Sequence, residues 1–161
     1  MNAIDPNKRA MTINWKYKNF TQLSPYELYD CLQLRSEIFV VEQNCVFLDM
    51  DNVDKDCFHL FGYHQNKLLA YARIVPPGIV YNEPSIGRVV TSPSVRKNGI
   101  GKQLMQQAIA AVKELYGNVS IKIGAQFYLK NFYEAFGFYQ ISDVYLEDGI
   151  EHIYMLKNAA T

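Results

Sequence analysis

The sequence predicts one mixed α/β domain over residues 12–161, preceded by a flexible tail over residues 1–11. The 161-residue length suits a single domain with a buried core. Segments in which apolar residues alternate are interleaved with segments in which they recur at helical spacing, and no repeat or low-complexity linker separates them. The expected order is therefore strand, helix, three strands, helix, strand, helix and two strands.

The first two elements have recognisable starting points. Apolar side chains alternate in TINWKYKNF from residue 12, which predicts a strand. A helix should begin after Ser24, because Pro25 suits its first position and Glu27 completes a capping box with Ser24. We expect this helix to break near Val40.

The middle of the chain is predicted to contain three strands. An acidic loop over residues 44–57 leads into a hairpin over residues 58–75, with its turn at Gln65-Asn66-Lys67. The PPG at residues 76–78 ends the hairpin, and a further strand follows over residues 85–92.

The clearest helix runs from Gly99 to Tyr116, because its apolar residues form one stripe: Ile100, Leu104, Met105, Ala108, Val112 and Leu115. A strand over residues 119–125 and a short helix ending at Gly137 should follow. Two strands, over residues 138–146 and 151–157, complete the chain.

Composition excludes several classes of protein. The formal net charge is zero, so a general attraction to nucleic acid or to an anionic membrane is not expected. No apolar run approaches the roughly 18 residues of a membrane span. The three cysteines are odd in number and lack CxxC spacing, which favours reduced, buried thiols in a cytoplasmic protein.

Residues 95–104, VRKNGIGKQL, place two glycines and three cations at the start of the long helix. A P-loop needs GxxxxGK[ST], but Arg96 stands at its first glycine and Gln103 follows Lys102. A dinucleotide fingerprint GxGxxG needs glycine where the chain has Leu104. Both nucleotide motifs are therefore excluded.

A more general anion site remains at this loop. Unpaired N–H groups and the helix dipole create positive potential at a helix N-terminus. The cations of RKNGIGK add charge, and its glycines let an anion approach the main chain. The alternative is that Asn98-Gly99 only makes a tight turn into the helix.

Two motifs together resemble a known family. RKNGIGKQLM, after a strand and a proline, resembles the (Q/R)xxGxG/A signature of the GNAT superfamily of acyl-CoA N-acyltransferases, and FYEAFGF resembles its second marker, xYxxxGF. The element order agrees over about residues 12–157. The stretch LRSEIFVVEQNCVFLDMDNVDKDCFHL and the later ARIVPPG are more specifically similar to the ElaA-like subgroup. Lys97 departs from a common form of the signature, which has glycine there.

The resemblance implies an N-acyltransferase domain over residues 12–161, with a mostly antiparallel sheet whose central strands splay apart between flanking helices. Acetyl-CoA would be the co-substrate, with no metal. A β-bulge near Val90 would open the gap, and Val89, Val90 and Thr91 would pair with the pantetheine arm. The coenzyme pyrophosphate would be bound by Arg96, Lys97, Asn98, Gly99, Ile100, Gly101 and Lys102.

The resemblance also implies two catalytic roles. A backbone N–H at Val90, or near it at Thr91, would stabilise the oxyanion. Tyr133 would protonate the leaving thiolate, although it could instead be a packing residue, and Tyr128 competes for the role. The general base stays open, because Arg88 stands in the strand that carries a glutamate in many relatives. The candidates are a water chain or one of four side chains: Glu42, His59, Glu151 and His152.

The acceptor is expected to be a small-molecule or peptide amine, attacking directly in a ternary complex. One acidic stretch spans Glu42 to Asp56 and another spans Asp143 to Glu151, so both could attract a cationic amine or simply be solvated loops. A homodimer is left open. The competing class is a non-catalytic acyl-CoA sensor.

Two further features concern the first acidic stretch. Arg35 and Arg73 lie among apolar residues, which favours ion pairs with the acidic loop over a role in gripping an acceptor carboxylate. A calcium loop at DMDNVDKD is disfavoured because Asp54 stands where the turn needs glycine.

Overall fold

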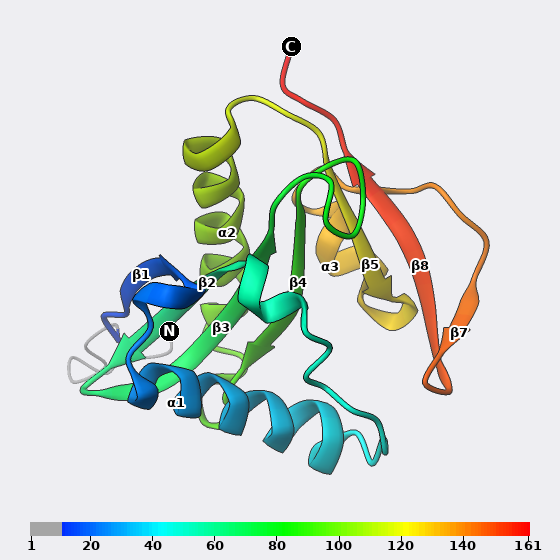
Figure 1. The fold of residues 1–161 in the computed structure, drawn as a ribbon. Helices are drawn as coiled ribbons and strands as arrows, with labels where there is room; N and C mark the ends of the chain where they lie inside the picture. Colours follow the sequence, from blue (N-terminus) through cyan, green and yellow to red (C-terminus); the bar gives the residue numbers. More distant parts are fainter. Residues whose placement is uncertain (1–10) are drawn as a thin grey trace, which may run out of the picture.

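The computed structural model describes residues 11–161, so the expected tail lies almost wholly outside the described residues. The elements follow the predicted order as far as the third helix (Figure 1). After it, three strands replace the expected two. They are β1 (Asn14–Asn19), α1 (Pro25–Arg35), β2 (Phe58–His64), β3 (Lys67–Val75), β4 (Ser85–Thr91), α2 (Ile100–Tyr116), β5 (Ile121–Gln126), α3 (Lys130–Glu134), β6 (Tyr139–Gln140), β7 (Tyr145–Glu147) and β8 (Ile150–Lys157). None of the helices within residues 11–161 is long and apolar enough to cross a membrane.

The strands form two antiparallel sheets, one with the order β1-β2-β3-β4 and one with the order β5-β8-β6, in which β7 also pairs with β8. Strands β4 and β5 start close together, where the N–H of Lys122 donates to the carbonyl of Pro84 at 3.2 Å. They then diverge toward the bottom of Figure 1. The predicted splayed centre of the fold is therefore confirmed.

A β-bulge in β4 accompanies this divergence. Arg73 pairs with Gly87 and Tyr71 pairs with Val90, so β4 uses one residue more than β3 over this stretch. Arg88 lies in the bulge with φ +49°, which is unusual for a residue that is not glycine. The bulge bends β4 at the place expected from the sequence.

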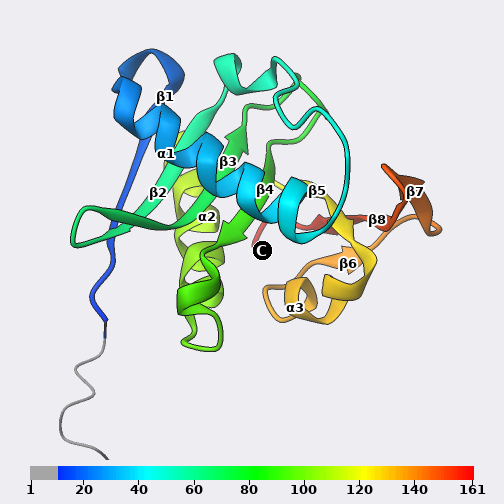
Figure 2. The same ribbon diagram turned by 90° about the horizontal axis from the view of Figure 1, so that it is seen from below.

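The helices cover opposite faces of the first sheet (Figure 2). Helix α2 contributes most of its predicted apolar stripe to the larger core cluster, together with residues of β3, β5 and β8. Helix α1 covers the other face, where Leu34 packs in a smaller cluster with Phe61, Tyr71 and Val90. Both faces of the first sheet are thus covered by packed core.

The capping box of α1 is present. The side chain of Ser24 accepts from the N–H of Glu27, and the N–H of Ser24 donates to the Glu27 carboxylate, both at 3.1 Å. The expected break near Val40 does not occur, because the chain continues as a wider π-helical segment over Ser36–Glu42. Glu27 also accepts hydrogen bonds from Lys16 and Lys18 of β1, each at 2.9 Å.

Two predicted boundaries are wrong. The hairpin turn contains only Gln65 and Asn66, both with positive φ, because Lys67 already pairs with His64. The strand expected over residues 138–146 is divided into β6 and β7. The hydroxyl of Ser142 accepts from the N–H of Tyr154 at 2.8 Å and so replaces a main-chain partner where the strand leaves the sheet.

The cysteines agree with a reduced protein. Cys31, Cys45 and Cys57 are free and buried. Burial raises the pKa of Cys31 and of Cys57 to about 12, which keeps both as thiols.

We expect Glu27 to make stability depend on acid pH. Burial raises the pKa of Glu27, but hydrogen bonds from Lys16 and Lys18 outweigh burial and bring that pKa down to about 2. A lowered folded-state pKa stabilises the protein above the ordinary carboxyl pKa of about 4.5, and the gain is lost as pH falls toward 2. Glu27→Gln should lower the free energy of unfolding at pH 7 by roughly 3 kcal/mol, and by almost nothing at pH 2.

The measurement is urea unfolding of wild type and variant from pH 2 to 7. Glu134→Gln removes an exposed carboxylate 3.8 Å from Lys130 and should change stability by less than about 0.5 kcal/mol. A deficit of E27Q that stayed constant across this pH range would contradict the ion-pair explanation.

Candidate active site

A cleft of about 830 Å³ occupies the gap between β4 and β5. Its walls come from the π-helical segment, β4 with its bulge, the segment after β5, and the β7–β8 hairpin. Of the residues predicted to bind the coenzyme or to act as the acid, it brings together Val89, Val90, Thr91, Arg96, Tyr128 and Tyr133. These residues lie up to 44 positions apart in the chain, so only the fold makes them one site.

The glycine loop continues from this cleft to the N-terminus of α2. Arg96 lines the cleft, and Gly99 takes the helix N-cap position with φ +76°. Within the described residues, no side chain caps this helix end, so N–H groups of its first turn are free to bind an anion. Lys97 has φ +67°, in the left-handed region that glycine adopts without strain, and glycine is the residue at this position in the common form of the motif.

The register of β4 decides which backbone groups face the gap. The N–H of Ser92 donates to the carbonyl of Leu69 in β3 at 2.8 Å. N–H groups alternate between the two edges of a strand, so Val90 directs its N–H toward β3, whereas Thr91 directs its N–H toward the open edge. Val89 lies two residues before Thr91, so the same alternation directs its N–H toward the open edge. The open edge can therefore pair with an extended ligand.

Tyr133 is held rigidly at the wall of the cleft. It is 7% exposed and packs edge-on against Phe132 and Phe138, with ring centroids 5.1 and 6.1 Å away. Burial raises the pKa of Tyr133, so the phenol stays protonated and can act as a hydrogen-bond donor. Tyr128 also lines the cleft but is 72% exposed, so packing does not fix its ring.

Two of the four side chains considered as bases lie outside the cleft. His59 is fully buried, with Nε2 2.8 Å from the carbonyl of Asp54 and Nδ1 2.7 Å from the hydroxyl of Tyr71. Burial lowers the pKa of His59, which therefore acts as a neutral core residue. Glu151 is exposed, and as the neighbour of His152 on β8 its side chain points to the opposite face of the sheet. Glu42 and His152 both line the cleft.

The segment over residues 42–45 contacts three other parts of the cleft wall. Glu42 forms an ion pair with Arg96 at 2.7 Å, and the amides of Gln43 and Gln126 meet at 3.2 Å. The thiol of Cys45 donates to the carbonyl of Asp148 at 3.3 Å. This segment thus links the glycine loop, β5 and the β7–β8 turn. The Glu42 carboxylate is already engaged by a cation.

A network of three arginines and three aspartates fixes the adjoining acidic loop. Arg35 is fully buried and holds Asp49 and Asp54 at 2.8 and 2.9 Å. Arg73 holds Asp51 and Asp54, and Arg88 of the bulge holds Asp49 at 2.8 Å. The predicted pairing of Arg35 and Arg73 with the loop is confirmed.

This pairing changes the interpretation of the first acidic stretch. Asp49, Asp51 and Asp54 are bound by arginines, and Glu42 is bound by Arg96. Their field is therefore largely neutralised, and the same pairing occupies the carboxylates that a calcium loop would need. Glu147 and Asp148 of the second acidic stretch do line the cleft.

Tyrosines lie around Gly124 of β5. A Cβ at Gly124 would lie 3.2 Å from the hydroxyls of both Tyr81 and Tyr145, so glycine leaves room there. Tyr154 packs against Tyr145 with ring centroids 4.7 Å apart. Sequence reasoning missed these residues, although alternation along β8 places Tyr154 on the same face as His152.

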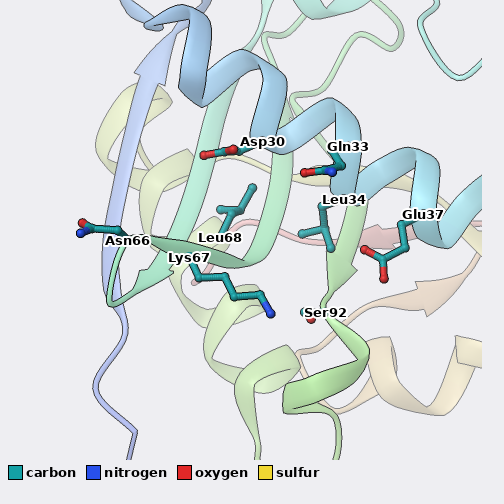
Figure 3. Close-up of a pocket in the computed structure, with 8 residues that line it drawn as sticks. All are labelled: Asp30, Gln33, Leu34, Glu37, Asn66, Lys67, Leu68 and Ser92. Atoms are coloured by element: carbon teal, nitrogen blue, oxygen red, sulfur yellow. The ribbon is translucent and has the colours of Figure 1, made fainter.

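A second, smaller cavity of about 240 Å³ lies beside α1 (Figure 3). It is lined by Asp30 and Gln33 from α1, by Glu37 from the π-helical segment and by Lys67 from the β2–β3 hairpin (Figure 3). Its lining residues include Ser92, shortly before the glycine loop, but none of residues 95–104. The larger cleft is therefore the candidate active site.

Comparison with known proteins identifies the class. The Acetyltransferase (GNAT) domain family matches residues 39–159, so the chain belongs to this family, and its class of reaction is acyl transfer. A UPF0039 protein of Synechocystis sp. is 43% identical over 91% of this chain and 96% of its own length. Protein ElaA of Escherichia coli is 40% identical over 90% of this chain and 96% of its own length.

Solved structures agree with this assignment. The crystal structure of Escherichia coli ElaA has a TM-score of 0.86 at 38% identity and covers 91% of this chain and all of its own. An acyl-CoA N-acyltransferase from Pseudomonas aeruginosa has a TM-score of 0.87 at 39% identity and covers 91% of this chain and 99% of its own.

Backbone strain at Lys97 can be measured. The left-handed conformation costs a residue with a Cβ roughly 1–2 kcal/mol, but glycine loses more entropy on folding and offsets part of this gain. Lys97→Gly should therefore raise the free energy of unfolding by up to about 1 kcal/mol. Lys97→Ala removes the same charge but keeps the Cβ, so its stability should match that of wild type. Equal stability of the two variants, measured by urea unfolding, would show that the loop is not strained.

Removing Asp54 should leave two buried arginines with incomplete charge pairing. Asp54→Ala leaves Arg35 and Arg73 each with one partner fewer, and we expect a loss of about 3 kcal/mol in the free energy of unfolding. Asp56→Ala, at an exposed position two residues later, should change stability by less than about 0.5 kcal/mol. Similar melting curves for the two variants would contradict a structural role for the network.

Proposed function

We propose that the protein transfers an acetyl group from acetyl-CoA to an amine acceptor by direct attack in a ternary complex. The observation that carries this proposal is the cleft itself. It brings an open strand edge together with a buried, protonated tyrosine, and its wall at Arg96 continues to a helix N-terminus free of side-chain caps. A thioester, a departing thiolate and a pyrophosphate require these three features respectively.

Each part of the coenzyme would have a matching group. The pyrophosphate would accept hydrogen bonds from the main chain of residues 96–102, with charge supplied by Arg96, Lys97 and Lys102. Arg96 would then exchange its ion pair with Glu42 for the phosphate. The pantetheine arm would pair with the open edge of β4 at Val89 and Thr91, as an added strand.

The reaction would use two fixed donors. The oxyanion would accept from an N–H at the open edge of β4, and the register favours Val89 or Thr91 over Val90 for this role. The Tyr133 phenol would give its proton to the thiolate as the C–S bond breaks. The raised pKa of Tyr133 supports an acid rather than a base.

The acceptor would be a small-molecule or peptide amine that enters beside the β7–β8 hairpin. The alternative is a non-catalytic acyl-CoA sensor, since the carboxylate-bearing position of many relatives is Arg88, which Asp49 already binds. Release of free thiol from acetyl-CoA across an amine and peptide panel, with calorimetric binding of coenzyme A, distinguishes them. Binding without release from any acceptor would favour the sensor.

Tyr133→Phe tests the acid. We expect kcat to fall about 100-fold with little change in the Kd of coenzyme A, because only the proton donor is lost. Tyr128→Phe removes the hydroxyl of the exposed tyrosine in the same cleft and should keep wild-type kcat. A large loss in Y128F and none in Y133F would transfer the role to Tyr128.

A further inference from the structure

A row of side chains faces the cleft from the second sheet. His152 of β8 pairs with Gln126 of β5 on one side and with Tyr145 of β7 on the other. Directly paired residues point to the same face of a sheet, so all three side chains share the cleft face. Gln126 ends β5 immediately before the segment that carries Tyr133. His152 therefore lies at the wide end of the gap, level with the start of that segment.

The His152 ring is held in one orientation. Its Nδ1 lies 2.7 Å from the carbonyl oxygen of Ile150, and its plane stacks on Tyr145 with ring centroids 5.8 Å apart. A carbonyl oxygen can only accept, so Nδ1 must carry the proton in the neutral ring. That tautomer leaves the lone pair on Nε2.

We propose that His152 is the general base, whose Nε2 takes a proton from the acceptor's ammonium group before the amine attacks the thioester. This inference rests on the proposed function and names the base that it lacks. Of the other side chains considered, His59 and Glu151 do not line the cleft. Glu42 lies beside Arg96 of the glycine loop, where the coenzyme pyrophosphate would bind, and not beside the β7–β8 hairpin, where the acceptor would enter.

The charges around the ring favour this transfer. Glu147 of β7 places a carboxylate oxygen 3.4 Å from Nε2, so it can pair with the imidazolium that forms. Asp148 lines the same end of the cleft, and burial raises the pKa of Tyr145, which stays neutral. On the facing wall, Arg73 and Arg88 are held by Asp51 and Asp49. Lys122 of β5 lies further along the same wall, with its ammonium over the rings of Tyr81 and Tyr154. At the His152 end, Glu147 and Asp148 supply the negative charge that attracts an ammonium group.

The proposed acyl transfer is balanced in protons and needs no further reactant. The ammonium nitrogen loses one proton to Nε2, and the neutral amine forms a C–N bond with the thioester carbonyl carbon. The C–S bond then breaks, and the thiolate takes the Tyr133 proton. The second proton leaves the nitrogen and restores the phenol, while the imidazolium releases its proton to solvent. The products are an amide, free coenzyme A thiol and one proton.

The test uses His152→Asn, whose amide can still donate to the Ile150 carbonyl. With phenethylamine and N-acetyl-lysine amide as probes, kcat/KM at pH 7 should fall about 100-fold while calorimetric binding of coenzyme A is unchanged. The deficit should narrow as pH approaches the amine pKa of about 10, because the amine is then already neutral. His64→Asn is the matched control, since His64 Nδ1 also contacts a carbonyl, that of Thr12 at 2.9 Å, on the first sheet.

The outcomes separate this inference from the proposed function. A wild type that acetylates no amine overturns the proposed function, and the proton-transfer role with it. An active wild type with an equally active H152N, or a deficit that is the same at every pH, overturns only the role of His152. Nitrogen-15 NMR of the neutral ring gives a readout independent of turnover, and a proton on Nε2 instead of Nδ1 would also overturn it.

Discussion

The fold of the active-site region depends on the network of Arg35, Arg73 and Arg88 with Asp49, Asp51 and Asp54. These ion pairs tie the end of α1 and the acidic loop to β3 and to the bulge of β4. A buried guanidinium group such as that of Arg35 needs carboxylate partners, so the aspartates hold the loop against the sheet. Because Arg88 stands in the bulge itself, the network also holds the bend that starts the cleft.

The bend has consequences for both sheets. It leaves one edge of β4 without a strand partner, and it directs the chain toward the helix N-terminus at Gly99. From the opposite side of the gap, α3 supplies Tyr133 and β8 of the second sheet supplies His152. Donor, acid and proposed base thus come from separate elements. Their spacing is set by how far β4 and β5 diverge, and no local loop conformation decides it.

Local rules predicted much of this arrangement. The capping box at Ser24, the long helix from residue 100 and the bulge near Val90 all agree with the sequence analysis, because each depends on neighbouring residues or on one family motif. The strand expected over residues 138–146 failed because Ser142 supplies a hydroxyl to a main-chain N–H twelve residues away. Acidity of the loop at residues 42–56 suggested a substrate field, but its distant arginine partners neutralise it.

By itself, the sequence determined the element order, the glycine loop at a helix start and the residues that resemble an acyltransferase motif. These features follow from short-range periodicity and spacing. Tertiary structure alone decided that His59 is a core residue while His152 lies in the cleft, and that Thr91 rather than Val90 presents its N–H to the gap. Burial and strand register arise from contacts between residues far apart in the chain. The same histidine side chain can therefore be a packing residue in one place and a candidate base in another.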